Sequence, residues 1–363
     1  MFKEKKLKRE VKIGQYTLGG NNPVRIQSMT NTPTKDTQAT LEQIMALAQQ
    51  GCEIVRVAVP DLETAKTLET LQKKSPLPLV ADIHFDYRLA IMALEAGFTA
   101  LRINPGNILK KQNDTTIIDT SPIDILAKKI LENNATVRVG VNSGSVEKDL
   151  LEKYGHPCPE ALVESALRHT KFLEDRGVTQ IKVSIKSSSV IDTIKANMLL
   201  DEKTDYPIHL GVTEAGTPMR GAVKSTLGIG NLLLNGIGDT IRVSLTANPI
   251  EEISVAKEIL RTAGLRNMGA ELISCPTCGR TEIDLIKIAK IVEEKLFLLP
   301  DNLKVAVMGC VVNGPGEAKE ADIGLAGGRG KGVIFRKGEI IHSIQGEENL
   351  LQTFLAELDK LKK

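Results

Sequence analysis

Residues 77–104, LPLVADIHFDYRLAIMALEAGFTALRIN, carry the pattern that decides the fold. An apolar run at Leu77–Phe85 precedes a stretch with helical spacing, YRLAIMALEAGF, and a second apolar run follows at Ala100–Asn104. Gly97 lies near the end of the helical stretch, where glycine is common because it adopts positive φ readily. A strand, a helix and a second strand in this order predict a parallel βαβ unit.

The same unit recurs from about residue 24 to residue 262. Apolar, β-branched runs predict eight strands, at Val24–Met29, Glu53–Val59, Leu77–Phe85, Ala100–Asn104, Thr136–Val141, Gln180–Ile185, Ile208–Val212 and Asp239–Leu245. Eight successive units favour closure into a (β/α)8 TIM-type barrel over an open sheet. No GxGxxG motif follows the first run, which weakens a dinucleotide-binding interpretation.

The pattern changes after residue 265. A CPTC motif is followed by a helical stretch, DLIKIAKIVEEKL, and then by a strand, KVAVMGC. After a glycine-rich passage come a hairpin, GVIFRKGEIIHSI, and a final helix, NLLQTFLAELDKLKK. We therefore expect a barrel domain at residues 1–264 and a smaller α+β domain at residues 265–363. A length of 363 residues is consistent with two domains.

Composition excludes several classes of function. The net charge of +2 and the 3% of aromatic residues, with no tryptophan, argue against a nucleic-acid-binding protein. No apolar run approaches the roughly 20 residues that span a bilayer, and the charged start, MFKEKKLKREV, does not resemble a secretory signal. Because five scattered cysteines do not suggest a disulfide framework, we expect a cytoplasmic protein.

Basic residues occur in or just after strands that should be nearly all apolar. They are Arg56, Arg102, Arg138, Lys182, Lys186 and Arg242. Each could pair with a local carboxylate or extend to solvent. Their recurrence at the C-terminal side of five strands instead favours a phosphate or diphosphate pocket, because the forked donors of arginine match phosphate oxygens.

Other polar residues lie near the same strand ends. Asn142 and Ser244 can add neutral donors to the pocket. Asp82 and His84 share strand parity and therefore face the same side. Glu214 ends the seventh strand, and these three groups are candidates for proton transfer. A core histidine at His84 and an arginine partner at Glu214 are the simpler interpretations.

Three of the cysteines form a possible metal site. Cys275 and Cys278 make the CPTC motif, Cys310 follows 32 residues later, and Glu317 could add an oxygen ligand. Three thiolates and a carboxylate suit a [4Fe–4S] cluster with one unusual iron. A structural zinc site and a thioredoxin-like redox pair are the alternatives, although no fourth Cys or well-placed His and no thioredoxin-like pattern support them.

Nine motifs together resemble one enzyme family. They are RIQSMTNTPT, ADIHFDYRLA, LRINPGN, VRVGVNSGS, IKVSIKSS, LGVTEAG, GIGDTIRVSL, CPTCGR and GCVVNGPGEA. The chain is similar over nearly its whole length to 4-hydroxy-3-methylbut-2-enyl diphosphate synthases of the non-mevalonate isoprenoid pathway. It looks like the compact two-domain bacterial form, because no large insertion separates the two domains.

The resemblance implies an activity and a set of site residues. The substrate would be 2-C-methyl-D-erythritol 2,4-cyclodiphosphate, which two electrons and two protons convert to the allylic diphosphate with loss of water. The implied diphosphate contacts are Arg56, Arg102, Arg138, Asn142, Lys186, Arg242 and Ser244; the implied cluster ligands are Cys275, Cys278, Cys310 and Glu317, with Asn313 nearby. Glu214 would assist protonation, and Asp82 and His84 would line the pocket.

The family also implies partners. Flavodoxin or ferredoxin would supply electrons, and the enzyme would be a homodimer in which one subunit's cluster domain caps the other's barrel. The alternative is that the chain is a redox-inert phosphosugar barrel enzyme whose appended domain holds a structural zinc ion. Lys182 or Lys186 would then be a candidate for a Schiff base.

Overall fold

The computed structural model of this chain describes residues 4–108, 110–111, 118–296, 299–310 and 318–362. The chain consists of two compact units, Met1–Arg266 and Asn267–Lys363. Within the described ranges, no helix is both long and apolar enough to cross a membrane.

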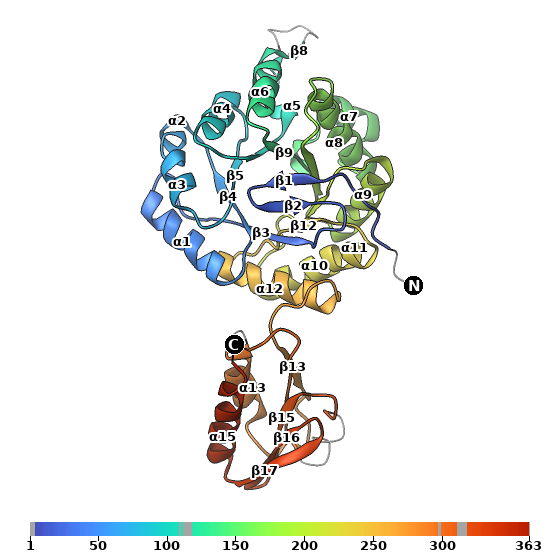
Figure 1. Cartoon of the computed structure of the whole chain (residues 1–363). Coiled ribbons are helices and arrows are strands. Elements are labelled where there is room, and N and C mark those ends of the chain that lie inside the picture. Colours follow the sequence, from blue (N-terminus) through green and yellow to red (C-terminus); the bar gives the residue numbers. More distant parts are fainter. Residues whose placement is uncertain (1–3, 109, 112–117, 297–298, 311–317, 363) are drawn as a thin grey trace. The chain divides into compact units, whose positions relative to one another are not determined.

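The first unit is a parallel β/α barrel, which confirms the predicted fold class (Figure 1). Across the described residues its sheet contains, in spatial order, β10 (Ile181–Lys186), β9 (Thr136–Asn142), β6 (Ala100–Ile103), β5 (Leu79–Asp82), β4 (Ile54–Ala58), β3 (Arg25–Met29), β12 (Thr240–Ile241) and β11 (His209–Leu210). A parallel bridge between Val183 and Ile208 joins the two ends of this order and nearly closes the barrel. Each strand lies within its predicted run or extends it by one residue.

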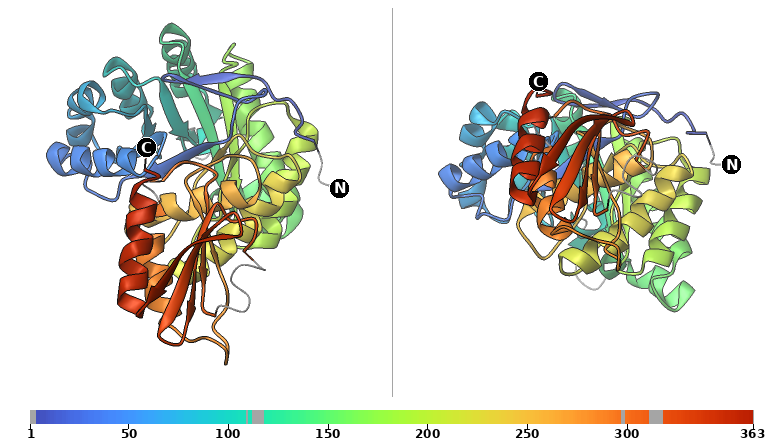
Figure 2. Two further views of the ribbon diagram at one scale, coloured as in Figure 1. Left: turned by 60° about the horizontal axis from the view of Figure 1, so that its bottom comes forward. Right: turned by 90° about the horizontal axis from the view of Figure 1, so that it is seen from below.

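Helices connect successive strands and surround the sheet (Figures 1 and 2). They are α1 (Thr37–Gln49), α2 (Leu62–Ala65), α3 (Leu68–Lys74), α4 (Tyr87–Glu95), α5 (Pro105–Ile108), α6 (Ser121–Glu132), α7 (Lys148–Tyr154), α8 (Pro159–Glu174), α9 (Val190–Lys203), α10 (Pro218–Ser225), α11 (Asn231–Leu234) and α12 (Pro249–Thr262). In α4, Leu89 and Ala93 are buried on one face, and the carboxylate of Asp86 accepts the Arg88 N–H at the helix start.

A hairpin that the sequence did not predict covers the N-terminal end of the barrel. Strands β1 (Val11–Ile13) and β2 (Tyr16–Leu18) pair antiparallel, and the hairpin lies across that end in Figure 1. The same hairpin residues, Val11, Ile13 and Leu18, pack against residues near the starts of β4, β5 and β6, namely Ile54, Val80 and Ala100. Two three-residue strands are too short to give a recognisable periodicity, which explains why they were missed. A further short pair joins β7 (Lys110–Lys111) to β8 (Ile118–Asp119).

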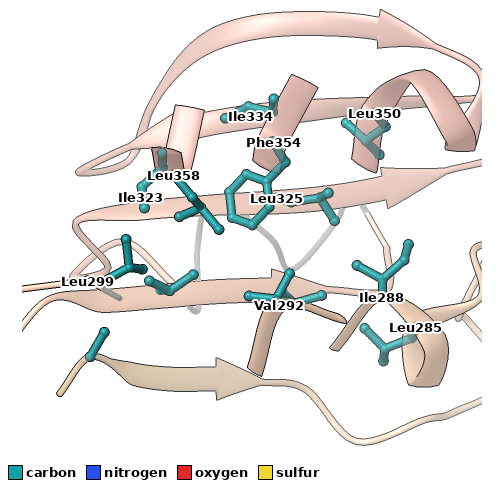
Figure 3. Packing of buried hydrophobic residues seen from close by; sticks show 13 residues of the cluster. Leu285, Ile288, Val292, Leu299, Ile323, Leu325, Ile334, Leu350, Phe354 and Leu358 are labelled. Carbon is teal, nitrogen blue, oxygen red and sulfur yellow. The ribbon is translucent and has the colours of Figure 1, made fainter. Parts of the chain in front are cut away.

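The second unit is an α+β domain built on a mixed sheet. Its strands, in spatial order, are β13 (Glu271–Ser274), β14 (Lys304–Met308), β15 (Ile323–Gly328), β16 (Lys331–Arg336) and β17 (Glu339–Gln345). The first three are parallel, and β16 and β17 form the predicted antiparallel hairpin. Helices α13 (Leu285–Glu293) and α15 (Glu347–Asp359) pack against one face of the sheet, and Figure 3 shows Phe354 of α15 beside Leu325 and Leu358.

Phe354 is the largest side chain of this small core and is fully buried. Phe354→Ala should lower the free energy of unfolding of the second unit by about 3–5 kcal/mol, because the lost transfer energy adds to the cost of a cavity. Hydrogen exchange read separately for each unit should show faster exchange in the sheet β13–β17 and unchanged exchange in the barrel. Phe85→Ala, at a side chain that is 70% exposed, is the control. Equal exchange in both variants would contradict the prediction.

Candidate functional site

All seven predicted substrate-binding residues line one polar cavity at the C-terminal ends of the barrel strands. They are Arg56, Arg102, Arg138, Asn142, Lys186, Arg242 and Ser244, and Ser184 and Thr213 complete the lining. The strand register explains this convergence, because Arg102 pairs with Arg138 between β6 and β9, and Lys186 pairs with Asn142 between β10 and β9. Side chains of the same parity on these strands face the barrel axis.

Glycines make room for the cations in this cavity. A Cβ atom on Gly140 would lie 2.7 Å from Arg102 Nε, and a Cβ atom on Gly211 would lie 2.6 Å from Lys186 Nζ. Any larger residue at either position would push a basic side chain out of the cavity. Gly140 in VRVGVNSGS and Gly211 in LGVTEAG therefore have a packing role beside the site.

Two buried carboxylates partly balance five basic side chains. Asp82 Oδ1 accepts a hydrogen bond from Arg102 Nη1 at 3.3 Å, and Asp82 Oδ2 lies 3.8 Å from Arg56 Nε. On the other side, Glu252 Oε1 lies 3.3 Å from Arg242 Nη2. Formally, five cations face two carboxylates, so the cavity retains an excess of positive charge that suits an anionic ligand.

Arg138, like Lys186, forms no ion pair with a carboxylate in the described part of the chain. It is 2% exposed. Its side chain donates a long hydrogen bond from Nη1 to the Ser184 hydroxyl at 3.4 Å. Burial lowers the pKa of Arg138, and the charges of Arg56 and Arg102 lower it further. An anion in the cavity would relieve this cost.

Asp82 remains ionised beside the cavity residues Arg56 and Arg102. Burial alone would raise the pKa of its carboxyl group, but Arg56, a hydrogen bond from His84 and Arg102 together hold the pKa well below its usual range. His84 Nε2 lies 3.3 Å from Asp82 Oδ2, and the imidazole is half exposed. Asp82 is therefore suited to orienting basic groups, while the half-exposed His84 remains open to solvent.

Glu214 follows β11 in a left-handed backbone conformation, with φ of +51°. Such a conformation is uncommon for a residue with a Cβ atom and is often retained at functional sites. The side chain is exposed, and Thr213, its neighbour in sequence, lines the cavity. Glu214 is therefore open to solvent and adjoins the cavity lining in sequence.

The sequence did not identify Glu252 or Ser184 as site residues. Glu252 lies in the first turn of α12, where an acidic residue is common. It nevertheless accepts hydrogen bonds from the Ser28 hydroxyl at 3.1 Å and the Leu245 N–H at 3.0 Å, and it thus fixes the loop after β12. Ser184 could have been found, because it has the same strand parity as Lys182 and Lys186.

Asp82→Asn is expected to destabilise the barrel by about 3–5 kcal/mol, because it leaves buried cations without their carboxylate partner. Thermal unfolding should show the loss, and added pyrophosphate should restore more stability to the variant than to the original protein. The isosteric amide keeps the volume of the side chain, so packing changes do not account for the effect. An unchanged melting temperature would contradict the prediction.

In the second unit, the three predicted cysteine ligands lie near one edge of the sheet. Cys275 directly follows β13, and Cys310 follows the parallel neighbour β14 by two residues. The Gly309 N–H donates a hydrogen bond to Cys275 Sγ at 3.2 Å, and the Glu282 N–H donates to the Gly309 carbonyl at 2.9 Å. The CPTC loop is therefore attached to the residue that precedes Cys310.

Their exposure differs, since Cys278 is exposed, Cys275 is half-buried and Cys310 is buried. Hydrogen bonds from the Arg280 backbone and side chain lower the pKa of the Cys278 thiol, which favours the thiolate that binds metals. In the described residues, no three His, Cys, Asp or Glu side chains are close enough to hold a metal ion as placed. The donor set of soft sulfurs with an N–H bond to one of them still fits an iron–sulfur group. Asn313 and Glu317 lie outside the described residues.

A larger surface cavity of about 410 Å³ lies at the opposite, N-terminal end of the barrel. Its lining mixes basic and acidic groups, and two of these interact locally: Arg9 contacts Asp205 at 2.8 Å, and the Tyr206 hydroxyl donates to Glu174 at 2.8 Å. This cavity does not share the excess of positive charge that distinguishes the site at the other end.

Solved structures with similar folds confirm the barrel. N-acetylneuraminic acid synthetase from Leptospira borgpetersenii superposes with a TM-score of 0.51 at 14% identity, over 80% of this chain and 97% of that chain. Type I 3-dehydroquinate dehydratase from Clostridium difficile gives a TM-score of 0.51 at 12% identity, over 70% and 97%. These similarities concern the fold alone.

Sequence comparison is far more specific. Residues 8–257 match the GcpE TIM-barrel domain, and residues 271–360 match the GcpE protein C-terminal domain. The 4-hydroxy-3-methylbut-2-en-1-yl diphosphate synthase (flavodoxin) of Lawsonia intracellularis is 57% identical over 98% of this chain and 97% of its own length. The synthase of the same name from Maridesulfovibrio salexigens is 58% identical, over 98% and 97%. With both of its units matched, this chain belongs to the GcpE family of 4-hydroxy-3-methylbut-2-en-1-yl diphosphate synthases.

Proposed function

We propose that this enzyme converts 2-C-methyl-D-erythritol 2,4-cyclodiphosphate to 4-hydroxy-3-methylbut-2-en-1-yl diphosphate in the non-mevalonate isoprenoid pathway. Two electrons and two protons enter, the ring C–O bond to phosphate breaks, and one oxygen leaves as water. The observation that carries the proposal is the cavity in which five basic side chains face only two carboxylates. A cyclic diphosphate supplies the missing negative charge.

The basic side chains bind and orient the diphosphate. Arg56, Arg102, Arg138, Lys186 and Arg242 offer charged donors, and Asn142 and Ser244 add neutral ones. When the ring opens, the phosphate that leaves carbon gains negative charge, and the same fixed cations stabilise it. In this proposal Glu214, which follows the cavity residue Thr213 in sequence, delivers a proton, and Asp82 holds Arg56 and Arg102 in place.

We further propose that Cys275, Cys278, Cys310 and Glu317 hold a [4Fe–4S] cluster as the resident cofactor. The family membership supports an iron–sulfur group, and the shared sheet edge of the three cysteines supports the ligand set. When bound, such a cluster supplies single electrons at low potential and one iron without a thiolate ligand.

The decisive experiment is anaerobic purification followed by iron and sulfide analysis, EPR of the reduced protein, and turnover of the cyclic diphosphate. We expect about four irons and four sulfides per chain, an EPR signal that the substrate perturbs, and formation of the allylic diphosphate. A colourless protein with one zinc, no iron and no turnover would instead support a redox-inert enzyme with a zinc-stapled appendage.

Glu317→Ala should retain a cluster and lose most activity, because three thiolates still bind it while the oxygen ligand is absent. We expect iron content near that of the original protein and a decrease in kcat of about a hundredfold, which corresponds to roughly 3 kcal/mol of transition-state stabilisation. Glu320→Ala, at an exposed residue of the same unit, is the control. Full activity in Glu317→Ala would remove this residue from the proposed ligand set.

Flavodoxin is the proposed electron donor, since the curated relatives carry it in their names, and ferredoxin is the alternative. We also propose a homodimer in which the barrel of one subunit and the cluster domain of the other serve one substrate. Co-expression of Arg102→Met with Cys278→Ser should then restore about a quarter of the activity through random pairing, although each variant alone is inactive. No recovery in the mixed dimers would overturn this arrangement.

A further inference from the structure

Lys182 lies one layer beneath the cavity, within the barrel interior. On β10, Lys182, Ser184 and Lys186 alternate with apolar residues and therefore face the same side of the strand. Ser184 and Lys186 line the cavity, whereas Lys182 does not. Lys182 precedes Ser184 by two positions on the strand, which places its Cα about 7 Å below that of Ser184. The Lys182 side chain is 1% exposed.

The amine of Lys182 has no compensating partner. Among the described residues, its Nζ makes no hydrogen bond and no ion pair. The basic groups that face it are Arg138 on β9 and Arg56 on β4, with Lys186 further along its own strand. Each of the two arginines disfavours a positive charge on Lys182.

The remaining neighbours do not supply a free carboxylate. Asp239, just before β12, lies 2.8 Å from Lys5 Nζ and accepts the Ile208 N–H at 2.9 Å. On β11, His209 Nδ1 bonds the Thr240 hydroxyl at 2.8 Å, while its buried Nε2 has no partner in the described part of the chain. Lys182 and His209 thus form a pair of buried basic groups without an acid between them.

On balance, these surroundings lower the proton affinity of Lys182. Burial lowers the pKa of its ammonium group, and Arg138 lowers it further, against an opposing contribution from Asp239. Burial and Arg138 likewise lower the pKa of His209 and of Lys186. A diphosphate in the cavity would offset the excess of positive charge there and would therefore favour the charged amine relative to the free enzyme.

We propose that Lys182 is a buried proton-uptake site coupled to the cavity: its amine is neutral in the free enzyme and takes one proton from solvent when a diphosphate binds. The step forms one N–H bond on the amine and transfers no electrons. It rests on the proposed function in one respect, namely that the cavity holds a diphosphate. Lys182 acts through the charge of the cavity and does not touch the ligand.

Isothermal titration with pyrophosphate tests the coupling, because repetition in buffers of different ionisation enthalpy counts the protons taken up. The full-length enzyme should take up as much as one more proton per site than Lys182→Met, and the protons of pyrophosphate itself cancel in this difference. Lys128→Met, at an exposed lysine of α6, should match the original protein. As the pH rises, the affinity of the original protein should fall more steeply than that of Lys182→Met, by at most about tenfold more per pH unit.

Equal proton counts in the original protein and Lys182→Met, with pyrophosphate bound to both, would overturn this inference and leave the proposed function intact. A failure of pyrophosphate to bind the original protein would overturn both. Lys182→Gln provides a second neutral side chain if the methionine variant does not fold, and the same loss of one proton is expected from it. A merely structural role of Lys182 would change stability and leave the proton count unchanged.

Discussion

Cys278→Ser is expected to lower turnover by about a thousandfold or more and to reduce the iron content of the anaerobically purified protein. The loss of one thiolate removes a cluster ligand, and each 1.4 kcal/mol of lost transition-state stabilisation costs a factor of ten in rate. Cys278 suits this test better than Cys310, because its side chain is exposed and Cys310 is buried. A substitution at an exposed site changes stability by no more than about 0.5 kcal/mol, so a loss of activity does not reflect unfolding.

Cys158→Ser is the matched control, since Cys158 lies at the start of α8 in the barrel unit. We expect it to retain iron, sulfide and activity. The thermal unfolding of both variants should be compared without metal, where they should be alike. Full turnover and full iron content in Cys278→Ser would exclude this residue as a ligand and weaken the iron–sulfur assignment.

Arg138→Met should weaken binding of the cyclic diphosphate by about a hundredfold to a thousandfold and should stabilise the ligand-free barrel. Hydrogen bonds to charged groups contribute about 1.5–3 kcal/mol each, and Arg138 can offer two such bonds to one phosphate. In the free protein the same guanidinium is buried beside Arg56 and Arg102 with no carboxylate of its own among the described residues. Its replacement by an apolar chain of similar length should therefore stabilise the fold by about 1–2 kcal/mol.

The opposite signs of these two effects make the prediction specific. Arg168→Met, which removes a partly exposed arginine paired with Asp149 on α7, should change neither binding nor stability appreciably. Equilibrium unfolding gives the stability, and titration with pyrophosphate gives the affinity. A variant of Arg138 that binds normally, or that loses stability and affinity together, would contradict the role assigned to this residue. Asp82→Asn should behave oppositely in stability, because it removes negative charge from the same cavity.

Much of the site followed from the sequence because it depends on strand parity. Arg102 and Arg138 lie on neighbouring parallel strands, and inward-facing positions on such strands converge at one end of a barrel. The grouping of the cysteines could be predicted in a similar way. A CPTC motif after one strand and a cysteine after the next strand place these residues at the same ends of neighbouring parallel strands. In both cases the position of a residue on its strand can be read from the local sequence. Assembly of the strands into a barrel or sheet then brings these positions together.

The sequence by itself therefore determined the eight βα units, the α+β domain after them, and the basic residues and cysteines that belong to each. Only the tertiary structure decided which charges are balanced: Glu252 reaches Ser28 across 224 residues of sequence, and Arg138 and Lys182 are left without acidic partners in the described part of the chain. It also decided the left-handed backbone at Glu214 and the hairpin β1–β2 across the barrel end. Periodicity records which face of a strand a residue occupies, but the energy of a buried charge depends on neighbours that only closure of the chain brings near.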